Sequence, residues 1–340
     1  MDATNVSSDY GVAMTTSAAD VECRSCWVNS VASIVVIATI VLSIGLNVPV
    51  IVAVWTMKPR RASYLFVGNL AVADALVGVV LILQLLPAPS VKYQCLVVVS
   101  LFLLSWVCSF VGTLFIAVDR HLVVLRPLRH KVILRSSRVV KLLVAMWALA
   151  AVWSLLPVVG VNLWYDGAQC NFSMLPPWYV VATASSYVGM AVVTGALYVS
   201  LFYRYRRDRQ TMNRLFQRSV SMEAERAQSV NLAKALLLVT GVFLLCWSPF
   251  TVMSVVTSVG LTSSYYDWIS TPIVWERVSV AYVLSYSLAI SNSVINPCLY
   301  AWKMNAIRES FVATARRCCR KPPRNAEFHP RECKTIESVL

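Results

Sequence analysis

The chain has 340 residues, of which 58% are hydrophobic and only 14% are charged. Soluble domains are about 45–50% apolar and about 25% charged, so a soluble fold could not hide this much apolar surface, and we expect lipid to surround the protein. The formal net charge of +14 would suit nucleic-acid binding, and the distribution of the basic residues must decide that question. The ten cysteines show no CxxC…CxxC spacing, which disfavours a zinc module.

The first 27 residues contain four acidic side chains and no apolar run. This composition is unlike a cleavable signal peptide, which needs a basic start and an apolar core. We therefore expect residues 1–27 to form an N-terminal tail outside the cell, and the first membrane span to direct insertion.

Seven apolar stretches follow, each long enough to cross a hydrocarbon layer of about 30 Å as a helix that rises about 1.5 Å per residue. The predicted fold class is an all-α membrane protein, in which residues 28–302 form a seven-transmembrane helix bundle. Only the connector 204–234 is long, and no internal repeat is found. The predicted spans are 28–56, 64–86, 95–118, 139–161, 178–203, 235–260 and 278–302.

The basic residues predict the orientation of the bundle. Of the 30 Lys and Arg residues, 27 fall on one side, in segments 57–63, 119–141, 204–234 and 303–340. Because basic residues collect on the cytoplasmic side, we expect a plasma-membrane protein with its N-terminus outside and its C-terminus in the cytoplasm. The high charge is then a topology signal, and no nucleic-acid partner is expected.

Two glycosylation sequons, at Asn5 and Asn171, fall on the predicted outer face. Sequons arise often by chance, but two on the expected side agree with the orientation.

One acidic residue lies deep within a predicted span. A carboxylate in mid-membrane costs about 2.5–3.5 kcal/mol on insertion scales, so Asp74 needs a reason to be there. Asn47, Ser109, Asn292 and Asn296 lie at a similar depth. Hydroxyl, amide and carboxylate oxygens suit a small hard cation, which favours an allosteric sodium site formed by Asp74, Ser109, Asn292 and Asn296. The alternative is a hydrogen-bonded cluster that only holds the helices together.

Two prolines interrupt predicted spans. Pro249 and Pro297 each remove a backbone hydrogen bond and predict a kink that could act as a hinge, the alternative being a static bend. At the cytoplasmic end of the third span, Asp119 precedes Arg120. This arginine could change partners between two states, although an arginine that merely reaches toward the membrane surface would look the same.

Together these features resemble the class A (rhodopsin-like) G-protein-coupled receptors, over residues 28 to about 319. Each motif is weak alone, but their order and spacing make chance an implausible explanation. The matching residues are Asn47, Asn69-Leu-Ala-Val-Ala-Asp74, Cys95, Asp119-Arg120-His121, Trp147 with Pro157, Cys170, Cys246-Trp247-Ser248-Pro249 and Asn296-Pro297-Cys298-Leu299-Tyr300.

The resemblance implies roles for several residues. Asp119 and Arg120, with Tyr198, Asn296, Pro297 and Tyr300, would form a switch that rearranges when the sixth span swings outward and admits a heterotrimeric G protein. Leu128 resembles the second-inner-loop residue that packs into the G protein, and Phe243 and Trp247 with Phe110 resemble a relay below the ligand. Arrestin and a receptor kinase are further partners that the family implies.

Two cysteines lie on the predicted outer side, where the surroundings are oxidising. The resemblance implies a disulfide between Cys95 and Cys170, the alternative being two unrelated free thiols. Whether Cys23 and Cys26 pair stays open.

The sequence also departs from the usual family pattern. Met190 stands where many members have proline, as in the melanocortin, cannabinoid and lysophospholipid receptors, yet those receptors mostly lack a bridge like that of Cys95 and Cys170. The subfamily therefore stays open. Ser229 stands where some members carry an acidic partner for the arginine, which suggests raised basal activity.

The predicted ligand pocket is aromatic with a few hydrogen-bonding groups. Phe102 replaces the aspartate of aminergic receptors, so a cationic amine would lack a counter-ion, and residues 278–300 contain no lysine that could hold retinal. A lipid or weakly polar small molecule fits best, and a peptide reaching Glu276 and Asp267 is the competitor. By family position the lining residues are Gln84, Phe102, Leu103, Trp106, Phe172, Trp247, Phe250, Ser254 and Tyr286.

The C-terminal region predicts attachment to the membrane surface. Residues 303–319 alternate apolar and basic positions as an amphipathic eighth helix would on acidic lipid. Cys318 and Cys319 are candidates for palmitoylation, the alternative being free thiols. In the cytoplasmic tail 320–340, the ending Ser338-Val339-Leu340 could bind a PDZ protein.

A seven-span transporter or channel is the alternative function. Transporters usually show two related halves and a path of several ionisable groups, neither of which is found here. An enzyme is disfavoured, because no nucleophile–base pair, metal-ligand cluster or phosphate-binding loop is recognised.

Overall fold

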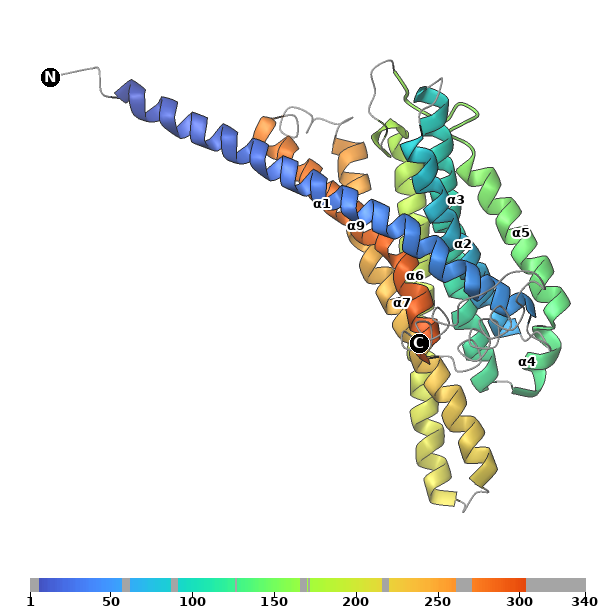
Figure 1. Cartoon of the computed structure of the whole chain (residues 1–340). Helices are drawn as coiled ribbons and strands as arrows, with labels where there is room; N and C mark the ends of the chain where they lie inside the picture. The colour runs from blue at the N-terminus through green and yellow to red at the C-terminus, as the bar shows by residue number, and fades with distance from the viewer. Residues whose placement is uncertain are drawn as a thin grey trace, which may run out of the picture.

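The computed structural model of the chain describes residues 6–56, 62–86, 91–125, 127–165, 170, 172–215, 220–260 and 271–303. Within this part of the chain all regular structure is helical (Figure 1). The elements in order are α1 (Val6–Thr56), α2 (Ala62–Leu85), α3 (Val91–Leu125), α4 (Pro127–Ile133), α5 (Ser136–Ser154), the 3₁₀ helix η1 (Phe172–Met174), α6 (Pro177–Leu215), α7 (Val220–Gly260) and α9 (Pro272–Lys303).

Seven of these helices are long and apolar enough to cross a membrane, as predicted, and they form a seven-helix bundle. The spanning segments are Ser30–Thr56, Ala62–Leu85, Val91–Val123, Ser136–Ser154, Pro177–Arg204, Leu237–Gly260 and Val274–Leu299. Residues 304–319, which carry nearly all of the predicted amphipathic helix, lie outside the described part of the chain.

The fourth span differs from its predicted bounds of 139–161, because helix α5 ends at Ser154. Residues 155–160 form turns. Pro157 explains the early end, since proline lacks an N–H and disfavours helical geometry in the residue before it. Apolar composition continues beyond Ser154, so hydropathy alone overestimated the helix.

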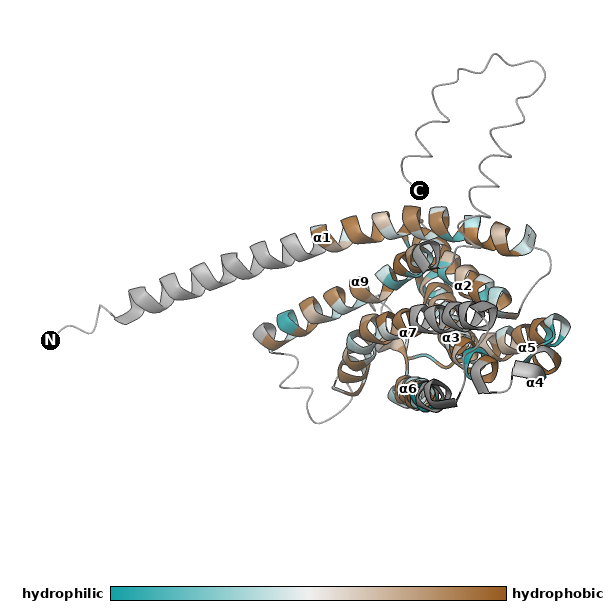
Figure 2. Ribbon diagram, turned by 90° about the horizontal axis from the view of Figure 1, so that it is seen from below, coloured by the Kyte–Doolittle hydropathy of each residue, from teal (hydrophilic) through white to brown (hydrophobic). Residues whose placement is uncertain are grey.

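Helix α3 lies at the centre of the bundle. It packs against α2, α5, α6 and α7, whereas α1 packs at the periphery against α2 and α9. Viewed along the bundle, the ribbons of the spans are coloured mostly as hydrophobic (Figure 2), and many of their large hydrophobic side chains are exposed. Leu149 is 72% exposed and Val199 is 71% exposed, which is tolerable only if lipid covers these side chains.

Asn69 on α2 joins three helices in the half of the bundle that contains Arg120. The indole N–H of Trp147 on α5 donates to Oδ1 of Asn69 (2.8 Å), and Nδ2 of Asn69 donates to the backbone carbonyl of Cys108 on α3 (3.3 Å). Gly112 faces this amide, and its missing side chain makes room for Asn69. The family motif residues Asn69 and Trp147 therefore have a structural role.

Gly112→Ala should destabilise the bundle. The added Cβ would lie 2.5 Å from Nδ2 of Asn69, so the Asn69 side chain must shift and its hydrogen bonds must weaken. A buried polar group that loses its partner costs about 1–3 kcal/mol of stability. We expect a lower melting temperature of the purified protein in detergent. Gly195→Ala is the control, because a Cβ there meets no atom within 4 Å; equal melting temperatures for the two variants would contradict the role of Gly112.

Candidate functional site

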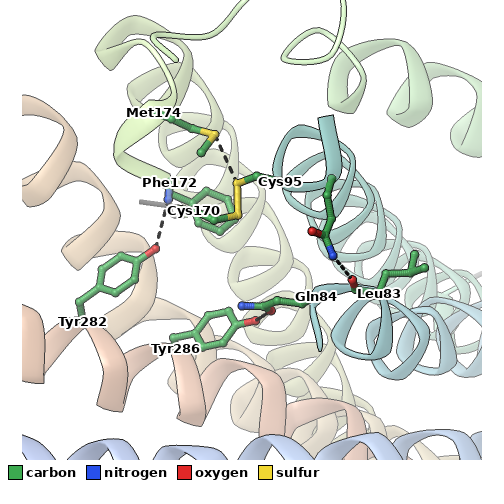
Figure 3. The surroundings of a disulfide bond; sticks show 9 residues. Leu83, Gln84, Cys95, Cys170, Phe172, Met174, Tyr282 and Tyr286 are labelled. Carbon is green, nitrogen blue, oxygen red and sulfur yellow. Dashed lines mark hydrogen bonds between the residues drawn. A yellow bond between two sulfur atoms is a disulfide. The ribbon is translucent and has the colours of Figure 1, made fainter. Parts of the chain in front are cut away.

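A disulfide fixes one end of the bundle. Cys95 on α3 is bonded to Cys170 in the segment before η1, which confirms the predicted pair (Figure 3). The bond holds η1 over the helices, where the backbone N–H of Phe172 donates to the hydroxyl of Tyr282 on α9 (3.5 Å). The 3₁₀ helix η1 thereby forms a lid that packs against α7 and is hydrogen-bonded to α9. We call this the disulfide end of the bundle.

A small pocket lies beneath this lid. Its volume is about 30 Å³, little more than one water molecule needs, so aromatic side chains almost fill it. The structure places six of the predicted ligand residues in its lining: Phe102, Leu103, Trp106, Phe172, Phe250 and Ser254. The lining residues that the sequence did not indicate are Leu175, Tyr179, Val180, Thr183, Ala184 and Thr251.

The other predicted ligand residues surround the pocket without lining it. Tyr286 donates a hydrogen bond to Oε1 of Gln84 (3.4 Å; Figure 3). Its ring centroid lies 5.5 Å from that of Phe102. Trp247 lies 5.7 Å from Phe102 and 5.7 Å from Trp106, also between ring centroids. A ligand that displaced Phe102 would therefore contact Tyr286 and Trp247, and through Tyr286 it would approach Gln84.

Aromatic rings connect the pocket to the middle of the bundle. Trp106 stacks on Trp247, which lies 5.9 Å from Phe243. Phe243 in turn stacks on Phe110 at 5.5 Å. Trp247, Phe243 and Phe110 were the predicted relay, and the structure places them in contact. Tyr187 on α6, which was not predicted, joins them at 4.9 Å from Phe110 and donates to the carbonyl of Leu244 (3.1 Å), one turn before Pro249 on α7.

The predicted polar cluster is buried in the bundle interior. Asp74 is 2% exposed, and its Oδ2 accepts a hydrogen bond from Nδ2 of Asn296 (2.9 Å). Asn47 donates to the carbonyls of Ser43 (2.9 Å) and Ser293 (2.8 Å), which ties α1 to α9. The structure thus brings α1, α2 and α9 together around one carboxylate.

Four buried oxygens of the predicted polar cluster are candidates to hold a cation. The oxygens are buried and have no hydrogen-bond partner in the described part of the chain: Oδ1 of Asn47, Asn292 and Asn296, and Oγ of Ser109. Leaving such groups unpaired costs about 1–3 kcal/mol each. Neutral oxygens beside one carboxylate are a donor set that fits a small hard cation. The described residues contain no cluster of three or more His, Cys, Asp or Glu residues of the kind that holds transition metals.

Asp119 and Arg120 are buried at the opposite end of the bundle, which we call the Arg120 end, and Asp119 is 1% exposed. Arg120 pairs with Asp119 and also contacts the hydroxyl of Ser63 on α2. Ser63 donates to Oδ2 of Asp119 (2.8 Å), and Nε2 of His130 on α4 lies 2.8 Å from Oδ1. The sequence did not indicate Ser63 or His130, because the contacts depend on how α2 and α4 meet α3.

The remaining predicted site residues are only partly described. Tyr198 shares a hydrogen bond with Thr240 on α7 (3.2 Å), and Pro297 is buried in α9. The positions whose side chains lie outside the described part of the chain are Leu128, Ser229 and Tyr300, and those that lie entirely outside it are Asn5, Asn171, Asp267, Cys318 and Cys319.

The geometry agrees with the family comparison. A family model described as 7 transmembrane receptor (rhodopsin family) matches residues 46–300, which is three quarters of the chain. The chain therefore belongs to the rhodopsin family of seven-transmembrane receptors. It is a multi-pass membrane receptor and not an enzyme.

Its relatives include receptors for different small ligands. The chain is 27% identical over 282 residues to cannabinoid receptor type 1B of Takifugu rubripes, covering 76% of this chain but only 57% of that receptor. It is 28% identical over 298 residues to sphingosine 1-phosphate receptor 1 of Danio rerio, covering 84% and 77%. Adenosine receptor A3 of Ovis aries is 26% identical over 300 residues, covering 82% and 89%. These similar identities leave the subfamily open.

The His130–Asp119 contact should stabilise the Arg120 end. We expect His130→Gln and Asp119→Asn each to lower the melting temperature, because each weakens a partly buried polar network. The melting temperature of the double variant should fall by less than the sum of the two single decreases, since both substitutions remove the same contact. Strictly additive losses in a thermal double-mutant cycle would show that the two side chains do not interact.

Proposed function

We propose that the protein binds an extracellular ligand at the disulfide end and activates a heterotrimeric G protein at the Arg120 end. The observation that carries this proposal is the continuous aromatic contact from Phe102 on α3 through Trp247 to Phe243 on α7, the helix that contains Pro249. A ligand that moves these rings would change the packing of α7 against α3. Outward movement of α7, the sixth span, would then open a cavity for the G protein.

The buried ion pair supports a two-state mechanism. Arg120 is 5% exposed and its partner Asp119 lies on the same helix, so the pair does not fasten α3 to α7. A ligand can shift the balance of states only through a difference in affinity between them. The pocket of about 30 Å³ must widen to admit a ligand, so the ligand would have a higher affinity for the state with the wider pocket.

We infer that the ligand is an uncharged lipid or weakly polar small molecule. None of the residues lining the pocket at the disulfide end is charged, and an unpaired charge would be costly there. The indole N–H of Trp247 is buried without a partner in the described part of the chain, so the ligand should offer a hydrogen-bond acceptor. Adenosine, which one relative's name gives, is an uncharged polar molecule, whereas sphingosine 1-phosphate, which another relative's name gives, carries a charged phosphate and falls outside this class. A peptide that reaches Glu276 is the competing ligand.

Sodium is proposed as an allosteric ion at Asp74, Ser109, Asn292 and Asn296. The unpaired buried oxygens support this assignment. When bound, the cation would supply the positive charge that the Asp74 carboxylate lacks in the bundle interior. Among these residues, the hydrogen bond from Asn296 to Asp74 joins α9 to α2.

Other proposals follow from the family and the sequence. They are a plasma-membrane location with the N-terminus outside, glycans on Asn5 and Asn171, and palmitoylation of Cys318 and Cys319 on a membrane-bound eighth helix. Arrestin, a receptor kinase and a PDZ protein are the proposed cytoplasmic partners.

Arg120→Ala should weaken G-protein activation while surface expression is retained. Loss of the switch cation is expected to reduce receptor-stimulated nucleotide exchange on added G protein by about tenfold, which corresponds to about 1.4 kcal/mol of coupling. Lys141→Ala is the control, because Lys141 is an exposed cation on α5 near the same end. Unchanged exchange in the Arg120 variant would refute the switch role. No exchange by the wild-type protein with any G protein would count against G-protein activation itself.

Asp74→Asn should remove a stabilising effect of sodium. The wild-type protein is expected to melt at a higher temperature in sodium chloride than in choline chloride of equal ionic strength, because an ion bound only by the folded protein stabilises it. The variant loses the charged ligand and should melt at the same temperature in both salts. An equal salt response in the two proteins would refute the sodium site.

A further inference from the structure

A second cavity lies away from the pocket beneath the disulfide, between α3, α5 and α6. Its volume is about 230 Å³, whereas the pocket beneath the disulfide has about 30 Å³. A dry apolar cavity of about 150 Å³ is large enough to bind benzene. The cavity is lined by Trp106, Val107, Phe110, Trp153, Ala182, Ser186, Tyr187 and Met190.

The mouth of this cavity opens toward the membrane. Ala182 and Ser186 line it and are both exposed. Ser186 lies nine residues into the span that begins at Pro177, which places it about 14 Å along the helix, near the middle of a hydrocarbon layer of about 30 Å. The flanking residue Val188 is 56% exposed, so lipid chains border the opening. A ligand would enter from the bilayer and not from water.

The lining selects a neutral molecule with an acceptor atom. None of the eight lining residues is charged. Trp153 donates its indole N–H to Thr183 (3.2 Å), and the Tyr187 hydroxyl is bonded to α7. Trp106 is 7% exposed and its indole N–H has no partner among the described residues. An acceptor oxygen would remove the cost of leaving this donor unpaired.

The lining can also adapt to a guest. Met190 borders the cavity and is only partly buried, and methionine is a flexible side chain that fills irregular gaps. Helix α6 runs without interruption past this residue, and the exposed residues Val192, Val193 and Val199 continue an apolar surface along it. A chain of methylene groups matches such an elongated apolar surface.

We propose that this cavity is a second binding site, for a neutral single-chain amphiphile dissolved in the bilayer, whose ester or amide oxygen accepts from Trp106. The apolar chain lies against Phe110, Tyr187 and Met190, and the mouth between Ala182 and Ser186 leads to lipid. Trp106 lines both this cavity and the pocket beneath the disulfide, so a guest here touches the wall of the other site. Binding itself does not depend on the proposed G-protein activation.

Photolabelling in nanodiscs tests the location of the site. The probe is a fatty-acid methyl ester with a diazirine on its chain, added to the full-length protein in phosphatidylcholine nanodiscs. We expect saturable labelling at Ala182 or Met190 that excess unlabelled ester displaces. Ser186→Phe should block the mouth and reduce labelling by about fivefold or more, the effect of roughly 1 kcal/mol, whereas Ser185→Phe should not. Both serines are exposed on α6, but only Ser186 lines the cavity.

Three outcomes would overturn this location. Labelling that excess ester does not displace would indicate bulk lipid contact. Equal labelling of the Ser186 and Ser185 variants would show that the cavity is not the site. Displaceable labelling of Phe172 or Phe250 instead would place the ester in the pocket beneath the disulfide. Ala182→Phe repeats the block without removing the hydrogen bond from Ser186 to the Thr183 carbonyl, in case Ser186→Phe misfolds.

A competition experiment tests the role of Trp106. The unlabelled ester should displace the probe from the wild-type protein about five- to tenfold more effectively than an alkane of equal length, because only the ester offers an acceptor. Trp106→Phe keeps an aromatic ring but removes the N–H, and there the two competitors should become equal. Equal competition by ester and alkane in the wild-type protein would overturn the assignment of Trp106 as the donor.

Discussion

The hydrocarbon interior of a bilayer offers no hydrogen-bond partner to a polar group, and the arrangement of the bundle follows from this constraint. Asp74, Asp119 and Arg120 are each 5% exposed or less, and all three would be costly inside a membrane without partners. Asp74 is hydrogen-bonded to Asn296 on α9. Asp119 is bonded to Ser63 on α2, contacts His130 on α4, and pairs with its neighbour Arg120. The polar groups thus decide which helices meet, because apolar surfaces gain little from leaving lipid for protein.

Helix α3 separates two kinds of contact. Phe102, Trp106 and Phe110 recur every four residues, so they share one face of the helix, and they contact rings on α6 and α7. Ser105 lies on another face and donates to the Ala73 carbonyl of α2 (2.6 Å). The aromatic face is where a ligand can alter packing, whereas the polar face holds α3 to α2. This division explains why one central helix can serve both the ligand pocket and the ion-pair end.

Hydropathy was sufficient to predict the seven spans, because the cost of inserting charged residues into lipid sets their ends. It could not show that Pro157 ends helix α5 early. Similar depth in the membrane predicted a cluster that contains Asp74 and Asn296, and these two side chains are hydrogen-bonded. The contributions of Tyr179 and Thr183 to the pocket were not predictable, since they depend on how α6 meets Trp153 of α5. The contact of His130 with Asp119 required the helical turn of α4, which a short basic connector does not reveal.

The position of the ion pair bears on how readily α7 can move. Among the described side chains, the partners of Arg120 are Asp119 and Ser63, on α3 and α2. Helix α7 is instead joined to α6 by neutral bonds, from Tyr187 to the Leu244 carbonyl and between Tyr198 and Thr240. A neutral hydrogen bond contributes about 0.5–1.5 kcal/mol, whereas separating a buried ion pair costs about 3–5 kcal/mol. Movement of α7 together with α6 would keep both neutral bonds, but it would change the packing of α7 against α9 and its aromatic contacts with α3. The α3 rings in those contacts line the two cavities, so a ligand in either cavity would touch them.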